Sequence, residues 1–232
     1  MKKLISLAMV IALMLALAAC GSNGGGGSGG SSSQTGPTLE ANGRTLALPC
    51  TLDELLEFGF TLESIGEFVD GPFATGVDDL VRLERHSEPR LTLQFTDGSK
   101  FIVTFVTPNS REEVRLGEFI FTSIQDYLSH DEVIGGLNDR TGALQYMIDN
   151  PSTLIINGIA KTDSLERADD IFSDFYRQQP LFQAHYHLNP EDSEPFVFNG
   201  YTVNSIYITI DDFDGGGALW RHMALNGVRP VE

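Results

Sequence analysis

The chain has 232 residues, and its 32 acidic and 15 basic side chains give a formal net charge of −17 at pH 7. This charge repels nucleic acid and anionic lipid surfaces, so we expect no nucleic-acid partner. The stretch from Thr38 to Glu232 is long enough for one sizeable domain or two small ones.

The amino-terminal segment, residues 1–19, has the pattern of an export signal. Lys2 and Lys3 give a charged start, mostly apolar residues follow from Leu4 to Ala19, and small residues precede Cys20. A membrane-spanning helix needs about 20 apolar residues. We therefore interpret the segment as a signal peptide.

The stretch Leu17-Ala18-Ala19-Cys20 resembles the lipobox of bacterial lipoproteins. That resemblance implies that Cys20 receives a diacylglyceryl group and becomes the mature amino terminus. It also implies localisation at the cell membrane, lipid-anchored on the extracytoplasmic side. Two acyl chains hold a protein firmly, whereas one gives reversible binding. An ordinary secretory signal with an incidental cysteine is the alternative.

Residues 20–37 comprise the lipidated cysteine and a tether that is almost entirely Gly and Ser. Such a segment has few side chains to bury and should span roughly 20 to 24 Å as a flexible coil. Tethers of this kind resemble those of Gram-positive surface lipoproteins. Cys50 is then the one remaining cysteine. Its apolar neighbours Leu48 and Leu52 favour a buried, inert thiol over a nucleophile.

The first half of the body begins with a capping box, Thr51 to Glu54, which predicts a short helix that ends at Gly59. Leu80 to Glu84 is a weak strand. Arg90 to Thr96 and Lys100 to Thr107 predict a hairpin, with Asp97-Gly98 in a primed turn. Glu118 to Gln125 is a further strand.

The second half repeats this order. Leu154 to Ala160 is strand-like, and Asp163 with Glu166 marks the start of a helix that Pro180 stops. Two strands follow, at Phe182 to Leu188 and Tyr201 to Asp211. The helix has an apolar stripe of Leu165, Ala168, Ile171, Phe172 and Phe175.

The repeated order predicts the α+β class, with two similar subdomains that each pack a short helix on an antiparallel sheet. We place the first at residues 38–132 and the second at residues 150–232, with a connector at 133–149 and a flexible C-terminal tail. The pairs Ser123-Ile124 and Ser205-Ile206 end the strands of the two halves. This match is short, and similar strand composition explains it about as well as duplication.

The run from Leu48-Pro49 to Gly59 resembles uncharacterised surface lipoproteins of Gram-positive bacteria. The helix-then-sheet unit is also similar to the small outer-membrane assembly lipoproteins and to the β-lactamase inhibitor protein. The second resemblance implies binding to other proteins, and it carries no site residue onto this chain.

Several enzyme signatures are absent from the sequence, including the G-x-S-x-G elbow, the H-E-x-x-H zinc helix, the Walker loop and G-x-G-x-x-G. We therefore expect a non-catalytic module, with no cofactor, that binds a protein, peptide or envelope component. An envelope hydrolase such as a carboxylate-dependent glycosidase is the alternative, because its two carboxylates have no fixed spacing.

A candidate contact face lies in the second half. If the strands Phe182–Leu188 and Tyr201–Asp211 pair, the residues that alternate with their apolar sets share one outer face. This face would comprise His185, His187, Tyr201, Val203 and Tyr207, and its affinity would change near pH 6.5. Burial of the two tyrosines against the first half is the alternative.

No metal site is expected. His185 and His187 could share a metal from one strand, but the sequence indicates no third ligand near them. Asp211, Asp212 and Asp214 could offer oxygens to Ca²⁺, but they lack the spacing of an EF-hand. We interpret them as a solvated strand end.

Overall fold

The structure is a computed structural model that describes residues 36–65, 74, 76–82, 88–109, 112–127, 152–161, 163–178, 183–190, 194–213 and 217–231. For residues 211–213 and 217–221 it describes the backbone alone. Residues Thr35–Glu232 form one unit. The expected signal peptide, Cys20 and connector lie outside the described residues. Within the described ranges, no helix has the length and apolar character needed to cross a membrane.

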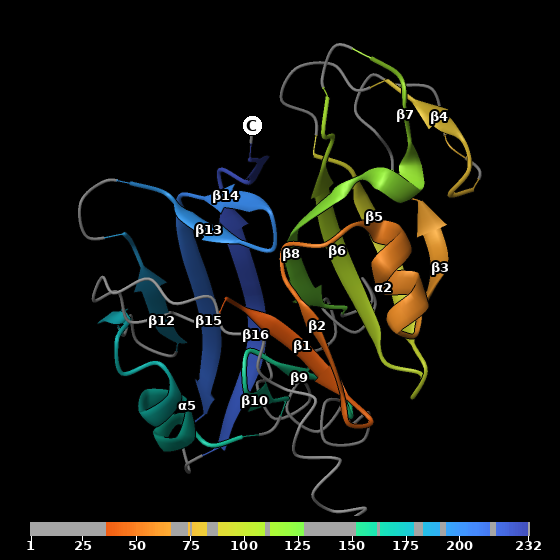
Figure 1. Cartoon of the computed structure of the whole chain (residues 1–232). Coiled ribbons are helices and arrows are strands. Elements are labelled where there is room, and N and C mark those ends of the chain that lie inside the picture. Colours follow the sequence, from red (N-terminus) through yellow and green to blue (C-terminus); the bar gives the residue numbers. More distant parts are fainter. Residues whose placement is uncertain are drawn as a thin grey trace, which may run out of the picture. The chain divides into compact units, whose positions relative to one another are not determined.

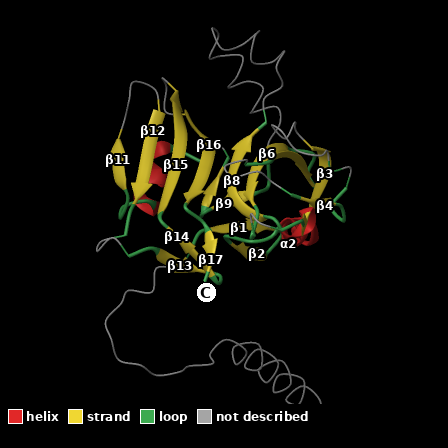
Figure 2. Cartoon of the chain, turned by 90° about the horizontal axis from the view of Figure 1, so that it is seen from above, coloured by secondary structure: helices red, strands yellow, loops and turns green. Residues whose placement is uncertain are grey.

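Eight strands form the main sheet, and they come from both halves of the chain (Figures 1 and 2). Their order across the sheet is β11-β12-β15-β16-β8-β6-β5-β3, and every neighbouring pair is antiparallel. The strands are β3 (Phe60–Ile65), β5 (Arg90–Phe95), β6 (Lys100–Val106), β8 (Ile120–Asp126), β11 (Tyr176–Gln178), β12 (Gln183–Leu188), β15 (Ser205–Phe213) and β16 (Gly217–Asn226).

The two halves meet where β8 pairs with β16, with Ile124 opposite Met223. The prediction of two subdomains with separate sheets is therefore not confirmed, because the sheet continues from one half into the other. The described residues hold two α-helices and are otherwise mostly antiparallel sheet, at the sheet-rich end of the α+β class. The end of the chain, expected as a flexible tail, instead includes the central strand β16.

Three smaller sheets accompany the main one. A four-stranded sheet has the order β10-β9-β1-β2, a three-stranded sheet has the order β13-β14-β17, and β4 pairs with β7. Their strands are β1 (Thr38–Ala41), β2 (Arg44–Ala47), β4 (Leu80–Val81), β7 (Val114–Arg115), β9 (Ile155–Ile156), β10 (Ile159–Ala160), β13 (Phe196–Phe198), β14 (Tyr201–Val203) and β17 (Arg229–Pro230). The antiparallel pairing of β1 with β9 joins the two halves a second time.

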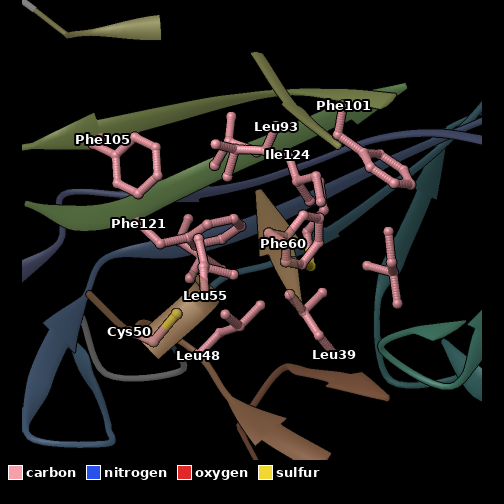
Figure 3. Packing of buried hydrophobic residues seen from close by; sticks show 14 of the residues in the cluster. Leu39, Leu48, Cys50, Leu55, Phe60, Leu93, Phe101, Phe105, Phe121 and Ile124 are labelled. Carbon is pink, nitrogen blue, oxygen red and sulfur yellow. The ribbon is translucent and has the colours of Figure 1, made fainter. Parts of the chain in front are cut away.

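The side chains on one face of the main sheet are part of the hydrophobic core. Side chains of the four-stranded sheet and of α2 (Leu52–Phe58) belong to the same buried cluster as side chains of the main sheet. Figure 3 shows Leu39, Leu48 and Leu55 gathered beside Phe60 and Phe121. In the second half, α5 (Leu165–Ile171) lies beside β10 and β16. The opposite, outer face of the sheet therefore carries the side chains that alternate with the buried ones.

The predicted capping box is confirmed. The Thr51 hydroxyl accepts a hydrogen bond from the Glu54 backbone N–H, and the Glu54 carboxylate accepts one from the Thr51 N–H. The helix ends at Gly59, whose φ of 132° suits a residue without a Cβ. Glu118 to Gln125, expected as one strand, divides into the 3₁₀ turn η1 (Leu116–Glu118) and β8.

The hairpin of β5 and β6 is confirmed, but its turn differs from the expected one. Gly98 has a φ of 89°, whereas Asp97 keeps a negative φ, so the turn is not of the primed type. The Gly98 N–H donates to the Phe95 carbonyl, and the Phe95 N–H donates to the Ser99 carbonyl. This arrangement matches a type I turn followed by a left-handed glycine, the usual alternative for a slightly longer loop.

The second-half helix starts one residue later and ends earlier than the sequence predicts. Ser164 is the N-cap and accepts from the Arg167 N–H, while the Asp163 carboxylate accepts from the Ala160 N–H. The helix ends at Phe172, and Phe175 has left it. The expected apolar stripe nevertheless packs against or within the core. Before it, Leu154–Ala160 forms the hairpin of β9 and β10 around Asn157-Gly158, both with positive φ.

Candidate functional site

The predicted pairing of the two second-half strands is confirmed. β12 and β15 are antiparallel, with His187 opposite Tyr207 and Tyr186 opposite Ile208. Ala184, Tyr186 and the three isoleucines of β15 are buried in the core. His185, His187 and Tyr207 therefore lie together on the outer face, as expected from the alternation.

The register extends this face across seven strands in two parallel rows. Cross-strand partners point to the same side of an antiparallel sheet, so each row can be followed from strand to strand. The first row is Tyr176, His187, Tyr207, Ala224, Ser123, Thr104 and Arg90, and the second is Gln178, His185, Thr209, His222, Gln125, Ile102 and Thr92.

Neither row contains an aspartate or a glutamate, although the chain has 32 acidic residues. The charged and titratable groups of the two rows are instead Arg90, three histidines and two tyrosines. The two rows are thus neutral to basic on an acidic protein. We call these fourteen residues the outer-face rows.

Tyr207 is the centre of an aromatic and imidazole cluster. Its ring centroid lies 5.4 Å from His185, 4.7 Å from His187 and 6.1 Å from His222, all in tilted or edge-on geometry. Edge-on and tilted geometries are favourable for pairs of aromatic rings. The Nε2 atom of His187 is buried and has no hydrogen-bond partner. His185 is positioned by a contact of 3.1 Å between its Nε2 atom and Oε1 of Gln183.

Tyr201 and Val203 do not belong to this face, which corrects the sequence-based expectation. They lie on β14, which pairs with β13 and β17 in another sheet. The chain bends at Asn204 before β15 begins, so the expected single strand is two. Val203 is fully buried, and Tyr201 packs against the core. Burial, aided by the nearby Glu54 and Cys50, raises the pKa of Tyr201.

His222 is the member of the cluster that sequence reasoning missed, because β16 was not predicted. The described part of β16 carries a detectable signal: Met223 and Leu225 are buried, while His222 and Ala224 alternate with them. Ala, Leu and Met also favour helices, which weakened that signal. A bulge beside Thr209 interrupts the register further.

A hollow of about 410 Å³ opens on the outer face over β6, β8 and β16. Seven residues of the outer-face rows line it, and so do Glu88 and the segment from Leu225 to Val228. The seven are Arg90, Ile102, Thr104, Ser123, Gln125, His222 and Ala224. His222 therefore belongs to both the cluster and the hollow.

Asn226 and Thr122 of this hollow donate to other residues, whereas four further donor side chains do not. Within the described ranges, the side chains of Arg90, Ser123, Gln125 and His222 make no hydrogen bond or ion pair. Burial lowers the pKa of His222, and the positive charge of Arg90 lowers it further. At neutral pH the imidazole is therefore uncharged, with one nitrogen to donate and one to accept.

The remaining sequence candidates have other roles. Cys50 is a buried free thiol, and burial raises its pKa far above the usual range, so it is a core residue. Among the described residues no group of three or more His, Cys, Asp or Glu could hold a metal ion. The side chains of Asp211 and Asp212, and all of Asp214, lie outside the described part of the chain.

Comparisons of the chain with protein-family models, with curated proteins and with solved structures find no match.

Proposed function

We propose that this protein is a non-catalytic binding module, anchored to the extracytoplasmic side of the membrane through Cys20, and that the outer-face rows bind a partner protein. The partner we propose is an envelope protein that presents neutral or acidic polar side chains. The observation that carries the proposal is the absence of carboxylates from the two rows in a chain with a net charge of −17.

The tyrosines of the rows, and the polar side chains around them, support protein binding. Tyrosine is enriched where proteins contact one another, because its ring buries a large area and its hydroxyl can still form a hydrogen bond. Tyr176, at the edge of the sheet in the first row, is 65% exposed. Tyr176 and Tyr207 lie toward one end of the first row, and most other side chains of the rows are polar. Protein interfaces likewise combine aromatic anchors with a polar rim.

We further propose that the two halves are similar units that arose by duplication. Support comes from the order of elements: a two-stranded hairpin, a short helix and four strands of the main sheet occur once before residue 127 and once after residue 152. The two hairpins pair with each other through β1 and β9, and the last strands of the two sets pair through β8 and β16. Both contacts are antiparallel, as a two-fold relation between the units requires.

The anchor is tested by metabolic labelling with a clickable fatty acid. The native chain should take up the label, and the Cys20→Ser variant should not. Equal labelling of the two chains would reject lipidation at Cys20.

The partner-binding face is tested by photo-crosslinking in cells, with a photoreactive phenylalanine analogue at Tyr207 or Gln178. We expect an adduct of discrete mass from each of these positions. Val197, on β13 and 64% exposed, is the matched control outside the rows and should give no such adduct. An identical set of adducts from all three positions, or adducts from Val197 alone, would reject the proposal.

A further inference from the structure

The hollow on the outer face brings together four polar side chains that make no hydrogen bond or ion pair within the described residues. Four side chains with hydrogen-bond donors line a volume of about 410 Å³. This is within the range of about 300 to 1,000 Å³ that is usual for small-molecule sites. Polar groups that converge in a concave site without partners are the usual feature that orients a ligand.

The four donors come from three different strands. Arg90 starts β5, Ser123 and Gln125 lie on β8, and His222 lies on β16. Thr104 on β6 is the cross-strand neighbour of both Ser123 and Arg90, and Gln125 is the cross-strand neighbour of His222. The antiparallel ladder therefore holds Arg90 and His222 on opposite sides of the hollow, with Ser123 and Gln125 between them.

The walls of the hollow also include apolar side chains and buried residues. Ile102 and Ala224 belong to the rows, while Leu225 and Val228 are buried next to the hollow. Thr122 and Thr104 are also buried, and the Thr122 hydroxyl donates to the Thr104 carbonyl. The Thr122 hydroxyl is thus paired with a backbone carbonyl, whereas the side chains of Arg90, Ser123, Gln125 and His222 remain for a ligand.

We propose that this hollow binds a small organic acid whose carboxylate pairs with the Arg90 guanidinium group. Arginine matches a carboxylate with two parallel hydrogen bonds, and the amide of Gln125 and the hydroxyl of Ser123 can donate to the same anion or to a polar group beside it. The hollow shares seven residues with the proposed partner-binding surface, but the argument for a bound acid does not depend on a partner protein.

The net charge of the protein and the charge of Glu88 limit the size and the number of carboxylates of the ligand. The net charge of −17 repels a strongly acidic macromolecule at long range, whereas a small acid with one or two carboxylates is repelled much less. Among the described residues that line the hollow, Glu88 is the one carboxylate, and it is exposed. It disfavours further carboxylates on the ligand and can accept from a donor such as an amino group.

The test uses the purified full-length protein in mild detergent, with butyrate, glutarate and glutamate as probes at up to about 10 mM. Butyramide is the neutral counterpart of butyrate, and inorganic phosphate is a non-carboxylate anion. The imidazole signals of the five histidines are followed by NMR as the pH is varied. A carboxylate that pairs with Arg90 offsets the charge that lowers the His222 pKa, so we expect the His222 pKa to rise with at least one acid, toward its value in the Arg90→Gln variant.

Substitutions separate the proposed contact from a general charge effect. Arg90→Gln should weaken binding of that acid about tenfold or more, because it removes a charge-assisted pair. Gln125→Glu should do the same by adding a negative charge to the hollow. Arg229→Gln is the matched control, since Arg229 is an exposed arginine on β17 that does not line the hollow.

Three results would overturn the proposal: no acid shifts His222, butyramide or phosphate acts as well as the acids, or Arg90→Gln binds as tightly as Arg229→Gln. Melting temperatures of the variants show whether each one is folded. The crosslinking experiment at Tyr207 has an independent readout, so this site can fail while the partner-binding face stands.

Discussion

Lys161 Nζ lies 3.0 Å from Asp126 Oδ1 in the interior of the protein, and the two side chains are 6% and 2% exposed. Asp126 is the last residue of β8, opposite Phe101 on the core side of the sheet. Lys161 follows β10 directly. The pair therefore ties the end of the first-half strands to the start of the second half, and the sequence offers no sign of it because the partners are 35 positions apart.

Replacement of Lys161 by Met should reduce the free energy of unfolding by about 3 to 5 kcal/mol, because the Asp126 carboxylate would remain buried without its cation. Urea unfolding measures this. Lys100→Met is the matched control: its ion pair with Glu63 is exposed and should contribute about 1 kcal/mol or less. The double variant Lys161→Met with Asp126→Leu should recover most of the loss. Equal effects of the two lysine substitutions would contradict a structural role for the buried pair.

The Thr51→Ala variant should lose about 1 kcal/mol of stability, since it removes the cap of α2 and breaks the reciprocal contact with Glu54. Glu57→Ala, on the exposed side of the same helix, truncates an exposed side chain without touching the cap. Thermal unfolding of the two variants is the comparison. A cost for Thr51→Ala no larger than that for Glu57→Ala would show that the cap does not stabilise this helix.

Asp97 links the β5–β6 turn to the start of the second half. Its carboxylate accepts hydrogen bonds from the Thr153 N–H, the Thr153 hydroxyl and the Ser152 hydroxyl. Burial alone would raise the pKa of Asp97, but hydrogen bonds from Ser99 and Thr153 outweigh it and hold the pKa below its usual range.

A carboxyl with a depressed pKa stabilises the folded state above the unfolded pKa of about 3.9 and loses that effect as the pH falls through the folded value. Asp97→Asn should therefore be less stable than the native chain at pH 7, with the difference shrinking below about pH 4. Unfolding by urea at several pH values checks this. The same difference at pH 7 and in acid would exclude the charged contacts as its cause.

His222 is a base, whereas Asp97 is an acid, but the stability linked to His222 also decreases as the pH falls. Burial and the Arg90 charge lower the pKa of His222, so the unfolded chain binds a proton more tightly than the folded one. The stability linked to this residue is complete above about pH 6.5 and is lost as the pH falls through the folded value. His222→Gln should reduce the loss of stability between about pH 7 and pH 5.

Arg90→Gln provides an internal check, because it should raise the His222 pKa partway while Arg229→Gln should leave it in place. Histidine NMR titration measures both. An unchanged His222 pKa in the Arg90→Gln variant would assign the whole shift to burial.

Local features were predictable from the sequence because each depends on neighbouring residues alone. The cap of α2 needs only Thr51 and Glu54, the end at Gly59 needs a residue without a Cβ, and the β5–β6 hairpin follows from alternation on both sides of a glycine turn. The pairing of β12 with β15 was also predictable, since both alternate strictly. That alternation correctly placed His185, His187 and Tyr207 on one face.

Tertiary structure decided what joins the two halves and what completes the candidate site. A bend at Asn204 removes Tyr201 and Val203 from the face, and β16 brings His222 beside Tyr207 and opposite Gln125. Periodicity in one strand specifies which side chains share a side, but not which strand will lie next to it. Neighbours across the sheet are selected by the total apolar surface buried, a property of the whole chain. The sequence by itself therefore determined the faces of single strands, whereas the carboxylate-free rows and the hollow exist only in the assembled sheet.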